Sequence, residues 1–294
     1  STAPDVDNYY WTQLGSDIDG EEDDYSGSSV SLSSDGTIVA IGAVSNDSFK
    51  GNVRVYEYNS FYGWSQLGFD IDGEATDDES GISVSLSSDE TNGIIVAIGA
   101  EYNDGNGSNS GHVRVYKWRE YTQDDKDDST YHYSSREQGT INTKPLIITE
   151  DISTAPDVDN YYWTQLGSDI DGAADNNYSG SSVSLSSDGT IVAIGEYGND
   201  SNKGHVRVYQ RDTSNTTTQP YGWKQLGSDI DGEADGDLSG NSVSLSGDGT
   251  IVAIGAPNND GNGSNSGHVR VYKYDSVNDS WVKIYKDIDG ENAG

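Results

Sequence analysis

The sequence contains no cysteine, which excludes disulfide bonds, cysteine-ligated zinc and thiol catalysis. Basic residues are scarce, since 16 Lys and Arg face 50 Asp and Glu and give a formal net charge of −34. Such a charge repels nucleic acid and anionic membranes and attracts cations. No apolar run approaches the roughly 18 residues of a membrane span, and no segment of the sequence has the pattern of a signal peptide. Rigidity must therefore come from elsewhere, and repetition combined with bound ions is one source.

Low hydrophobicity and high charge are ordinarily typical of disorder. The 20 Tyr, the six Trp and the regular runs of Val and Ile argue against that interpretation. Helical periodicity is absent, so the apolar residues indicate short strands.

A repeated unit is the main feature of the sequence. Each copy opens with W-x-Q-L-G-x-D-I-D-G and continues with S-G-x-S-V-S-L-S, I-V-A-I-G and G-[HN]-V-R-V-Y. Four copies begin at Trp11, Trp64, Trp163 and Trp223, and a truncated fifth begins at Trp281. A search for such repeats comes first because the period decides the fold class.

A second duplication lies above the first, because residues 1–20 and 153–172 are identical. This predicts two tandem two-blade units, residues 1–152 and 153–294, in one continuous repeat architecture. The first unit carries an inserted loop at about residues 119–152. The array starts and stops in mid-repeat, from which we expect a piece cut from a longer array.

Each unit divides into four short strands separated by turn signals such as Ser34-Asp35-Gly36. The first alternates Val30 and Leu32 with serines, the second (37–43) is apolar on both faces, and the third (51–58) alternates valines with polar residues. The Trp of the following copy supplies the fourth. Four antiparallel strands in each repeat, at the spacing of the Trp residues that open successive copies, predict an all-β fold of propeller blades in tandem. A β-solenoid is the alternative, but its rungs are much shorter.

These motifs resemble a known family. S-G-x-S-V-S-L, then I-V-A-I-G-A-P ending at Pro257, then G-H-V-R-V-Y, is similar to the FG-GAP repeat of integrin α-chain propellers. The similarity is greater to a divergent branch found in marine microbial and algal surface proteins. It covers all four units and implies an integrin-like β-propeller or an open blade array. Two departures are the replacement of Phe-Gly by Ser-Gly and the shortening of the family's calcium loop D-x-D-x-D-G to Ser-Asp-Gly.

The recurring D-I-D-G-E segment is the first candidate calcium site. Carboxylates at alternate positions beside a Gly turn are how a short loop offers oxygens to calcium, whereas the alternative is that they cap turns. An acid or amide also lies three residues before the Gly of each S-G, and Ala173 replaces one Glu. The candidates are Asp17, Asp19, Glu21, Asp24, Asp70, Asp72, Glu74, Asp78, Asp169, Asp171, Asp229, Asp231, Glu233 and Asp237.

A second candidate is N-D-G-N-G-S-N-S-G, which occurs at residues 103–111 and 259–267. It offers the oxygens of Asp104 and Asn106 in the first copy, and those of Asp260 and Asn262 in the second. The alternative is that such Gly/Asn loops are turns with left-handed residues.

An enzyme is not predicted. Catalytic carboxylates need environments that push their pKa values apart, yet the same acid pair recurs in the same context in every blade. His112, His205 and His268 likewise occupy one equivalent strand position, with Asn52 in the remaining unit. We interpret this repetition as architecture.

Candidate glycosylation sites follow from N-x-[ST] sequons, most of them in inter-strand loops. They are Asn46, Asn106, Asn177, Asn199, Asn215, Asn262 and Asn278.

The function that we predict is an extracellular, calcium-stabilised glycoprotein that builds a surface coat, fibre or adhesin by self-association. The first alternative is a carbohydrate- or protein-ligand-binding propeller, and the second is a polysaccharide lyase or hydrolase on a propeller scaffold. Strand counting predicts that the segment Tyr9–Gly15 has no blade of its own. Such an edge tends to pair with another chain, which predicts linear polymerisation or a longer tandem chain.

Overall fold

The computed structural model describes residues 10–120 and 161–291, and these form four antiparallel sheets, one per repeat. Blade 1 contains β1 (Ser26–Leu32), β2 (Ile38–Ala43), β3 (Asn52–Asn59), β4 (Gly63–Gln66) and β5 (Ile71–Asp72). Blade 2 contains β6 (Ser83–Asp89), β7 (Gly93–Ala100), β8 (His112–Glu120), β9 (Tyr161–Gln165) and β10 (Ile170–Asp171). Blade 3 contains β11 (Ser182–Leu185), β12 (Ile191–Glu196), β13 (His205–Arg211), β14 (Trp223–Gln225) and β15 (Ile230–Asp231). Blade 4 contains β16 (Ser242–Leu245), β17 (Ile251–Ala256), β18 (His268–Asp275), β19 (Ser280–Lys283) and β20 (Ile288–Asp289).

The predicted all-β architecture of tandem four-stranded blades is confirmed. The described helical segments are single turns, α1 (Asn46–Phe49) and α3 (Asn199–Asn202). None of the described helices is long and apolar enough to cross a membrane.

The outer strand of each blade is split into two short pieces. In blade 1, β4 pairs with the end of β3, and the two residues of β5 pair with its start. The D-I-D segment, which we expected in a loop, is therefore the second half of an outer strand. Its isoleucine is buried in the first three blades, at 5%, 1% and 5% exposure for Ile71, Ile170 and Ile230.

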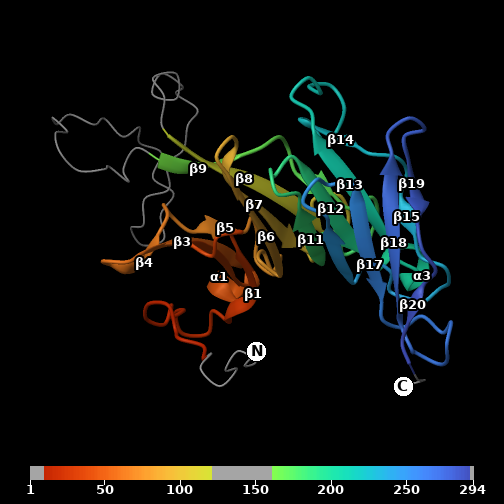
Figure 1. Ribbon diagram of the computed structural model, residues 1–294, viewed down its shortest axis with the longest axis horizontal. Coiled ribbons are helices and arrows are strands. Elements are labelled where there is room, and N and C mark those ends of the chain that lie inside the picture. The colour runs from red at the N-terminus through yellow and green to blue at the C-terminus, as the bar shows by residue number, and fades with distance from the viewer. Residues whose placement is uncertain (1–9, 121–160, 292–294) are drawn as a thin grey trace, which may run out of the picture.

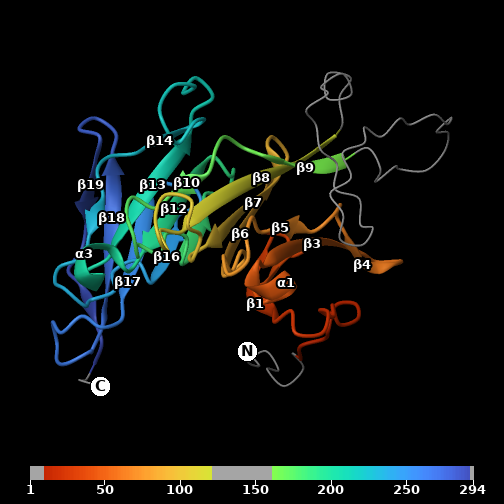
Figure 2. The ribbon, with the colours of Figure 1, turned by 180° about the vertical axis from the view of Figure 1, so that it is seen from behind.

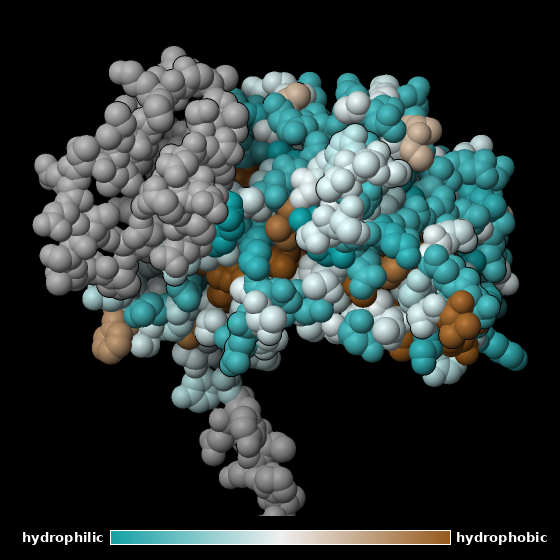
Figure 3. All heavy atoms as spheres, turned by 90° about the horizontal axis from the view of Figure 1, so that it is seen from above, coloured by the Kyte–Doolittle hydropathy of each residue, from teal (hydrophilic) through white to brown (hydrophobic). Residues whose placement is uncertain are grey.

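The four sheets lie side by side in chain order (Figures 1 and 2), and their first strands are adjacent. Ser83 Oγ donates a hydrogen bond to the carbonyl of Gly180 in the next blade at 2.7 Å, and the Leu185 amide donates to Ser85 Oγ at 2.9 Å. The same pair of bonds joins the other junctions. The core is divided among the junctions, where β7 and β8 of blade 2, for example, pack on β11 and β12 of blade 3. In the view from above, most of the visible surface of the described residues is hydrophilic (Figure 3).

The close approach of neighbouring blades explains the glycine of I-V-A-I-G. A Cβ on Gly99 would lie 1.9 Å from the carbonyl oxygen of Gly180 in the following blade. Only glycine allows this distance. The carbonyl in this contact belongs to Gly180, the glycine of the Ser-Gly that replaces the family's Phe-Gly.

The inserted loop lies between two paired strands of blade 2. Arg119 and Glu120 belong to β8, and β9 returns at Tyr161 to pair with it. Residues 121–160 are outside the described part of the chain, and so is the predicted boundary between residues 152 and 153. That boundary would separate β9 from the sheet that it completes.

The two ends of the row expose surfaces that are covered elsewhere. Val30 and Leu32 of β1 are 64% and 58% exposed, whereas Val84 and Leu86 at the same positions of β6 are both 9% exposed. At the other end, Ile288 is 60% exposed, against 5% for its equivalent Ile230. One end thus exposes the surface that elsewhere packs on the preceding blade, and the opposite end exposes the surface that elsewhere packs on the following blade.

The described part of the Tyr9–Gly15 segment, residues 10–15, forms no strand, and Trp11 is fully exposed. Its position follows the repeat nevertheless. The Trp64 indole donates a hydrogen bond to the Leu14 carbonyl, as the Trp163 indole does to Leu67. The expectation that this segment lacks a blade is confirmed for residues 10–15.

Candidate functional site

The junction loops between blades contain the candidate carboxylates and the repeated histidine. Each D-I-D-G-E segment leaves the outer strand of one blade and enters the next blade. The third strand of each blade, which carries the H-x-R or N-x-R pair at its start, runs beside that segment. Repetition therefore places the same kinds of side chain together at every junction.

The first aspartate of each D-I-D accepts a side-chain hydrogen bond from the glutamine four residues earlier. Gln66 donates to Asp70 at 2.7 Å, and Gln165 donates to Asp169 at 2.6 Å. The same contact joins Gln13 to Asp17 and Gln225 to Asp229. In the truncated repeat, Lys283 replaces glutamine and forms an ion pair with Asp287 at 2.7 Å.

The second aspartate contributes its backbone to the next blade. The carbonyls of Asp72, Asp171 and Asp231 each accept a hydrogen bond at 2.7 Å from the arginine of the following blade, which is Arg114, Arg207 or Arg270. Burial raises the pKa values of the Asp72 and Asp171 carboxyls, and neighbouring Asp70 or Asp169 raises them further. Asp19 is exposed at the end of the row.

The acid before each S-G is buried and holds a turn. Asp78 accepts the Ala75 amide at 2.9 Å and the Asn103 side chain at 2.9 Å. Asp237 makes the same two contacts with Ala234 and Asn259, and Asp24 makes them with Glu21 and Asn46. These acids therefore act here as turn caps, which was the alternative to calcium ligation.

The N-D-G-N-G-S-N-S-G loops are also closed by their own side chains. Asp104 accepts the Asn109 amide at 2.8 Å, and Asn106 donates to the Gly172 carbonyl at 2.8 Å. Asp260 and Asn262 repeat these contacts with Asn265 and Gly290.

The glutamate of D-I-D-G-E lies beside the histidine and arginine of the next blade. Glu74 Oε2 is 3.8 Å from His112 Nδ1, and its Oε1 is 3.9 Å from Arg114. Glu233 repeats this arrangement with His268 at 3.9 Å and Arg270 at 3.7 Å. Burial, reinforced by Arg114, lowers the pKa of His112 to about 4.

Blade 3 supplies its carboxylate from a different element. Ala173 stands where the other loops have glutamate, but Glu196 ends β12, where the other blades have Ala43, Ala100 or Ala256. Glu196 is fully buried opposite His205, whose Nε2 lies 3.1 Å from it, and it forms an ion pair with Arg207. The pKa of Glu196 is lowered, because contacts with His205 and Arg207 outweigh burial, which would raise it.

Blade 1 has neither arrangement. Asn52 replaces histidine and donates to Asp70 at 3.1 Å, while Arg54 forms ion pairs with Glu21, Asp24 and Asp70. The sequence flagged Ala173 and Asn52 as departures. The sequence also shows Glu196 as the one acid at the last position of I-V-A-I-G-x. Only the strand pairing, which places Glu196 opposite His205, shows that it supplies a carboxylate to the blade whose loop has Ala173.

The sequon asparagines differ in how their side chains are used. The Asn177 side chain is buried and donates to Glu196 at 3.1 Å. Asn215 donates to the Trp223 carbonyl at 2.7 Å and organises the loop before β14. Asn278 is exposed and contacts Asp275, and Asn199 is half-buried. Among the candidates, Asn106, Asn262 and Asn278 are exposed and thus accessible to a glycan.

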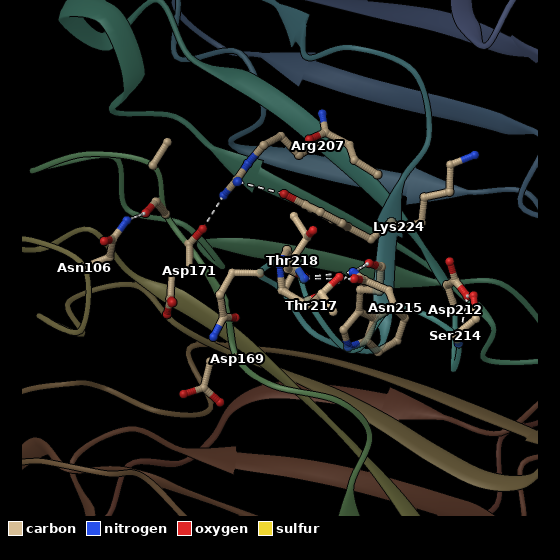
Figure 4. A pocket seen from close by; sticks show the side chains of 17 residues that line it. Asn106, Asp169, Asp171, Arg207, Asp212, Ser214, Asn215, Thr217, Thr218 and Lys224 are labelled. Carbon is tan, nitrogen blue, oxygen red and sulfur yellow. Dashed lines mark hydrogen bonds between the residues drawn. The ribbon is translucent and has the colours of Figure 1, made fainter.

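A cavity of about 850 Å3 opens beside the junction of blades 2 and 3. Figure 4 shows Asp169, Asp171 and Arg207 on one side and the loop around Asn215 on the other. The aromatic residues in its wall, Tyr209 and Trp223, are 3% and 1% exposed, so neither offers a ring face for stacking on a sugar.

Comparison with known proteins identifies the repeat. Residues 229–272, which span β15 to most of β18, match the FG-GAP repeat. No curated protein sequence matches the chain.

Solved structures similar to the chain include Sqt1 from Chaetomium thermophilum, with a TM-score of 0.45 and 13% identity over 86% of this chain and 44% of that one. TolB from Acinetobacter baumannii has a TM-score of 0.41 and 14% identity over 90% of this chain and 43% of that one. The chain thus spans less than half the length of either protein. A putative 6-phosphogluconolactonase from Bacteroides uniformis has a TM-score of 0.32 and 12% identity, covering 90% and 85%.

Proposed function

We propose that this chain of FG-GAP repeats is an extracellular building block whose blades join head to tail with those of a second copy into a surface coat, fibre or filament. The FG-GAP match at residues 229–272 supports a β-propeller-type protein, and the same motifs recur in the other three units. An extracellular location and a structural or adhesive role go beyond that match and are part of the proposal. Glycans at exposed sequons and bound calcium are also part of it.

The exposed end surfaces carry the proposal. The β1 surface, Val30 and Leu32, corresponds to the surface of β6, β11 and β16 that packs on a preceding blade. The surface of blade 4 that includes Ile251, Val269 and Ile288 corresponds to one that is covered in each earlier blade. The molecule therefore already makes this contact three times, between successive blades. The two surfaces that have no blade packed on them, on blade 1 and blade 4, lie at opposite ends of the row. A heterologous contact of this kind builds filaments unless it closes a ring.

The alternatives have less support. The repeated carboxylates cap turns or bind arginine and glutamine, which are structural uses, and this favours a structural role over a lyase or hydrolase. A carbohydrate-binding role would use the cavity beside Asp171, but its two aromatic side chains are buried.

The test uses variants that block one end each. Leu32→Asp places a charge on the first surface, and Ile288→Asp places one on the second. Each variant alone should remain monomeric by sedimentation velocity, because every contact needs both surfaces. An equimolar mixture should form a 1:1 dimer, because each variant retains the surface that the other has lost.

A matched control is Val277→Asp, at a residue that is 90% exposed in the turn between β18 and β19. It should assemble like the wild type. A monomeric wild type, or a mixture that stays monomeric, would refute head-to-tail assembly.

A further inference from the structure

Two junctions bring one histidine and two carboxylates within reach of a single ion. In the first, these groups belong to Glu74, His112 and Asp169, and in the second to Glu233, His268 and Asp287. One ligand atom from each residue lies within 4.8 Å of the other two in both clusters. The glutamate comes from the loop that enters the blade, the histidine from its third strand, and the aspartate from the break between the two halves of its outer strand.

The histidine of the first cluster is buried without a hydrogen-bond partner. His112 is 1% exposed, and neither Nδ1 nor Nε2 has a hydrogen-bond partner among the described residues. Its Nδ1 points toward the cluster, 3.8 Å from Glu74 Oε2. Buried polar atoms are normally satisfied, so an unpaired imidazole beside two carboxylates indicates a missing partner that accepts electron pairs from all three.

The surroundings favour a cation at this point. Arg114 lies nearest to Glu74 Oε1 and donates to the Asp72 carbonyl, which leaves Oε2 directed to the histidine. Burial raises the pKa of Glu74, and the negative charges of Asp169 and of two further carboxylates, Asp78 and Asp171, raise it more, whereas Arg114 lowers it. In the second cluster, Lys283 contacts Oδ1 of Asp287, and Arg270 lies nearest to Oε1 of Glu233.

The other two blades lack part of the triad. In blade 3, Ala173 removes the loop carboxylate, and Glu196 contacts His205 Nε2 at 3.1 Å. In blade 1, Asn52 replaces the histidine and donates to Asp70 at 3.1 Å. Within the described part of the chain, a histidine whose Nδ1 lies beside a loop glutamate thus occurs only in blades 2 and 4, which have the full triad.

We propose that the Glu74–His112–Asp169 and Glu233–His268–Asp287 clusters each bind a divalent transition-metal ion, with Zn²⁺ as the representative ion. Neutral imidazole and carboxylate oxygens are typical zinc ligands, whereas calcium takes oxygen ligands almost exclusively. Such an ion would tie the loop that enters a blade to the third and outer strands of that blade. This proposal is independent of head-to-tail assembly.

The experiment is calorimetric titration of tag-free, metal-stripped protein with ZnCl2 in the presence of millimolar CaCl2. We expect two Zn²⁺ per chain, one per cluster. His112→Asn should remove one of them, and His112→Asn with His268→Asn should remove both. Asparagine is the residue that blade 1 already has at this position, so the variants should fold, and circular dichroism checks this. X-ray absorption of the zinc-loaded protein should show an imidazole ligand at about 2.0 Å.

Glu21→Gln is the matched control, because Glu21 occupies the loop position of blade 1, where no histidine is present. It should leave the zinc stoichiometry unchanged. Glu74→Gln provides a second test should His112→Asn unfold the protein, and it should also remove one ion. Absence of zinc binding under these conditions, an unchanged stoichiometry in both Glu74→Gln and His112→Asn, or an all-oxygen absorption spectrum would overturn the proposal.

Discussion

At the level of single residues, blade 3 shows that the position of a carboxylate can move between elements while its partners stay. Glu196 at the end of β12 contacts His205 at Nε2 and Arg207, whereas the loop glutamates of blades 2 and 4 approach Nδ1 of the equivalent histidine and the equivalent arginine. Its cross-strand neighbour is His205, whereas His112 and His268 face Ala100 and Ala256. A buried charge of this kind depends on its partners, since removal of one partner leaves the others uncompensated.

Glu196→Ala should therefore destabilise the protein by about 3–5 kcal/mol, because Arg207 and His205 remain buried without their carboxylate. Adding Ala173→Glu should recover a substantial part of this loss, since it recreates the loop glutamate of blades 2 and 4. Urea unfolding of the wild type, the single variants and the double variant measures the coupling. If the double variant is no more stable than Glu196→Ala, the two positions are not exchangeable.

At the level of elements, the strands of each blade and the donation of the fourth strand by the next repeat could be predicted from the sequence. Alternation in S-V-S-L, the doubly apolar I-V-A-I and the position of each Trp were enough, because each reflects local pattern and period. The split of the outer strand could not be predicted, since the two residues of β5 carry no periodicity. The different contacts of the first and second D-I-D aspartates could not be predicted either, because they depend on how successive repeats pack.

Gly99→Ala should destabilise the protein by roughly 3 kcal/mol, at the upper end of overpacking effects, because its Cβ would meet the backbone of the next blade. Gly255→Ala is a matched control in blade 4. There the nearest atom to a Cβ is Ser242 Oγ at 2.4 Å, and Gly99 has the same type of contact with Ser83 Oγ at 2.5 Å. The difference between the two variants in urea unfolding of monomeric protein isolates the junction. Equal losses would show that the blades do not approach as closely as described.

At the level of the whole molecule, the scarcity of basic residues and the blade junctions are connected. Arg54, Arg114, Arg207 and Arg270 are all buried near the start of a third strand, so a quarter of the 16 basic residues contribute little to the outer surface. The surface that remains is dominated by carboxylates, and their repulsion opposes the compact state. The sequence predicted the charge and its affinity for cations, but the acids that cap turns could be separated from the accessible ones only in the folded chain.

Calcium should therefore stabilise the protein beyond the effect of ionic strength. The exposed acids of the predicted calcium set that do not cap turns include Asp19, Glu21, Asp229 and Asp231. An ion that binds only the folded state at 100 times its dissociation constant adds about 2.7 kcal/mol, which corresponds to a rise of roughly 4 °C in Tm for a chain of this size. Calorimetric scans in EGTA and in millimolar CaCl2 measure this difference, with NaCl at matched ionic strength as the control. To keep zinc out of the comparison, both scans use His112→Asn with His268→Asn. A Tm that is the same in EGTA and calcium, or that NaCl raises equally, would reduce the role of calcium to screening.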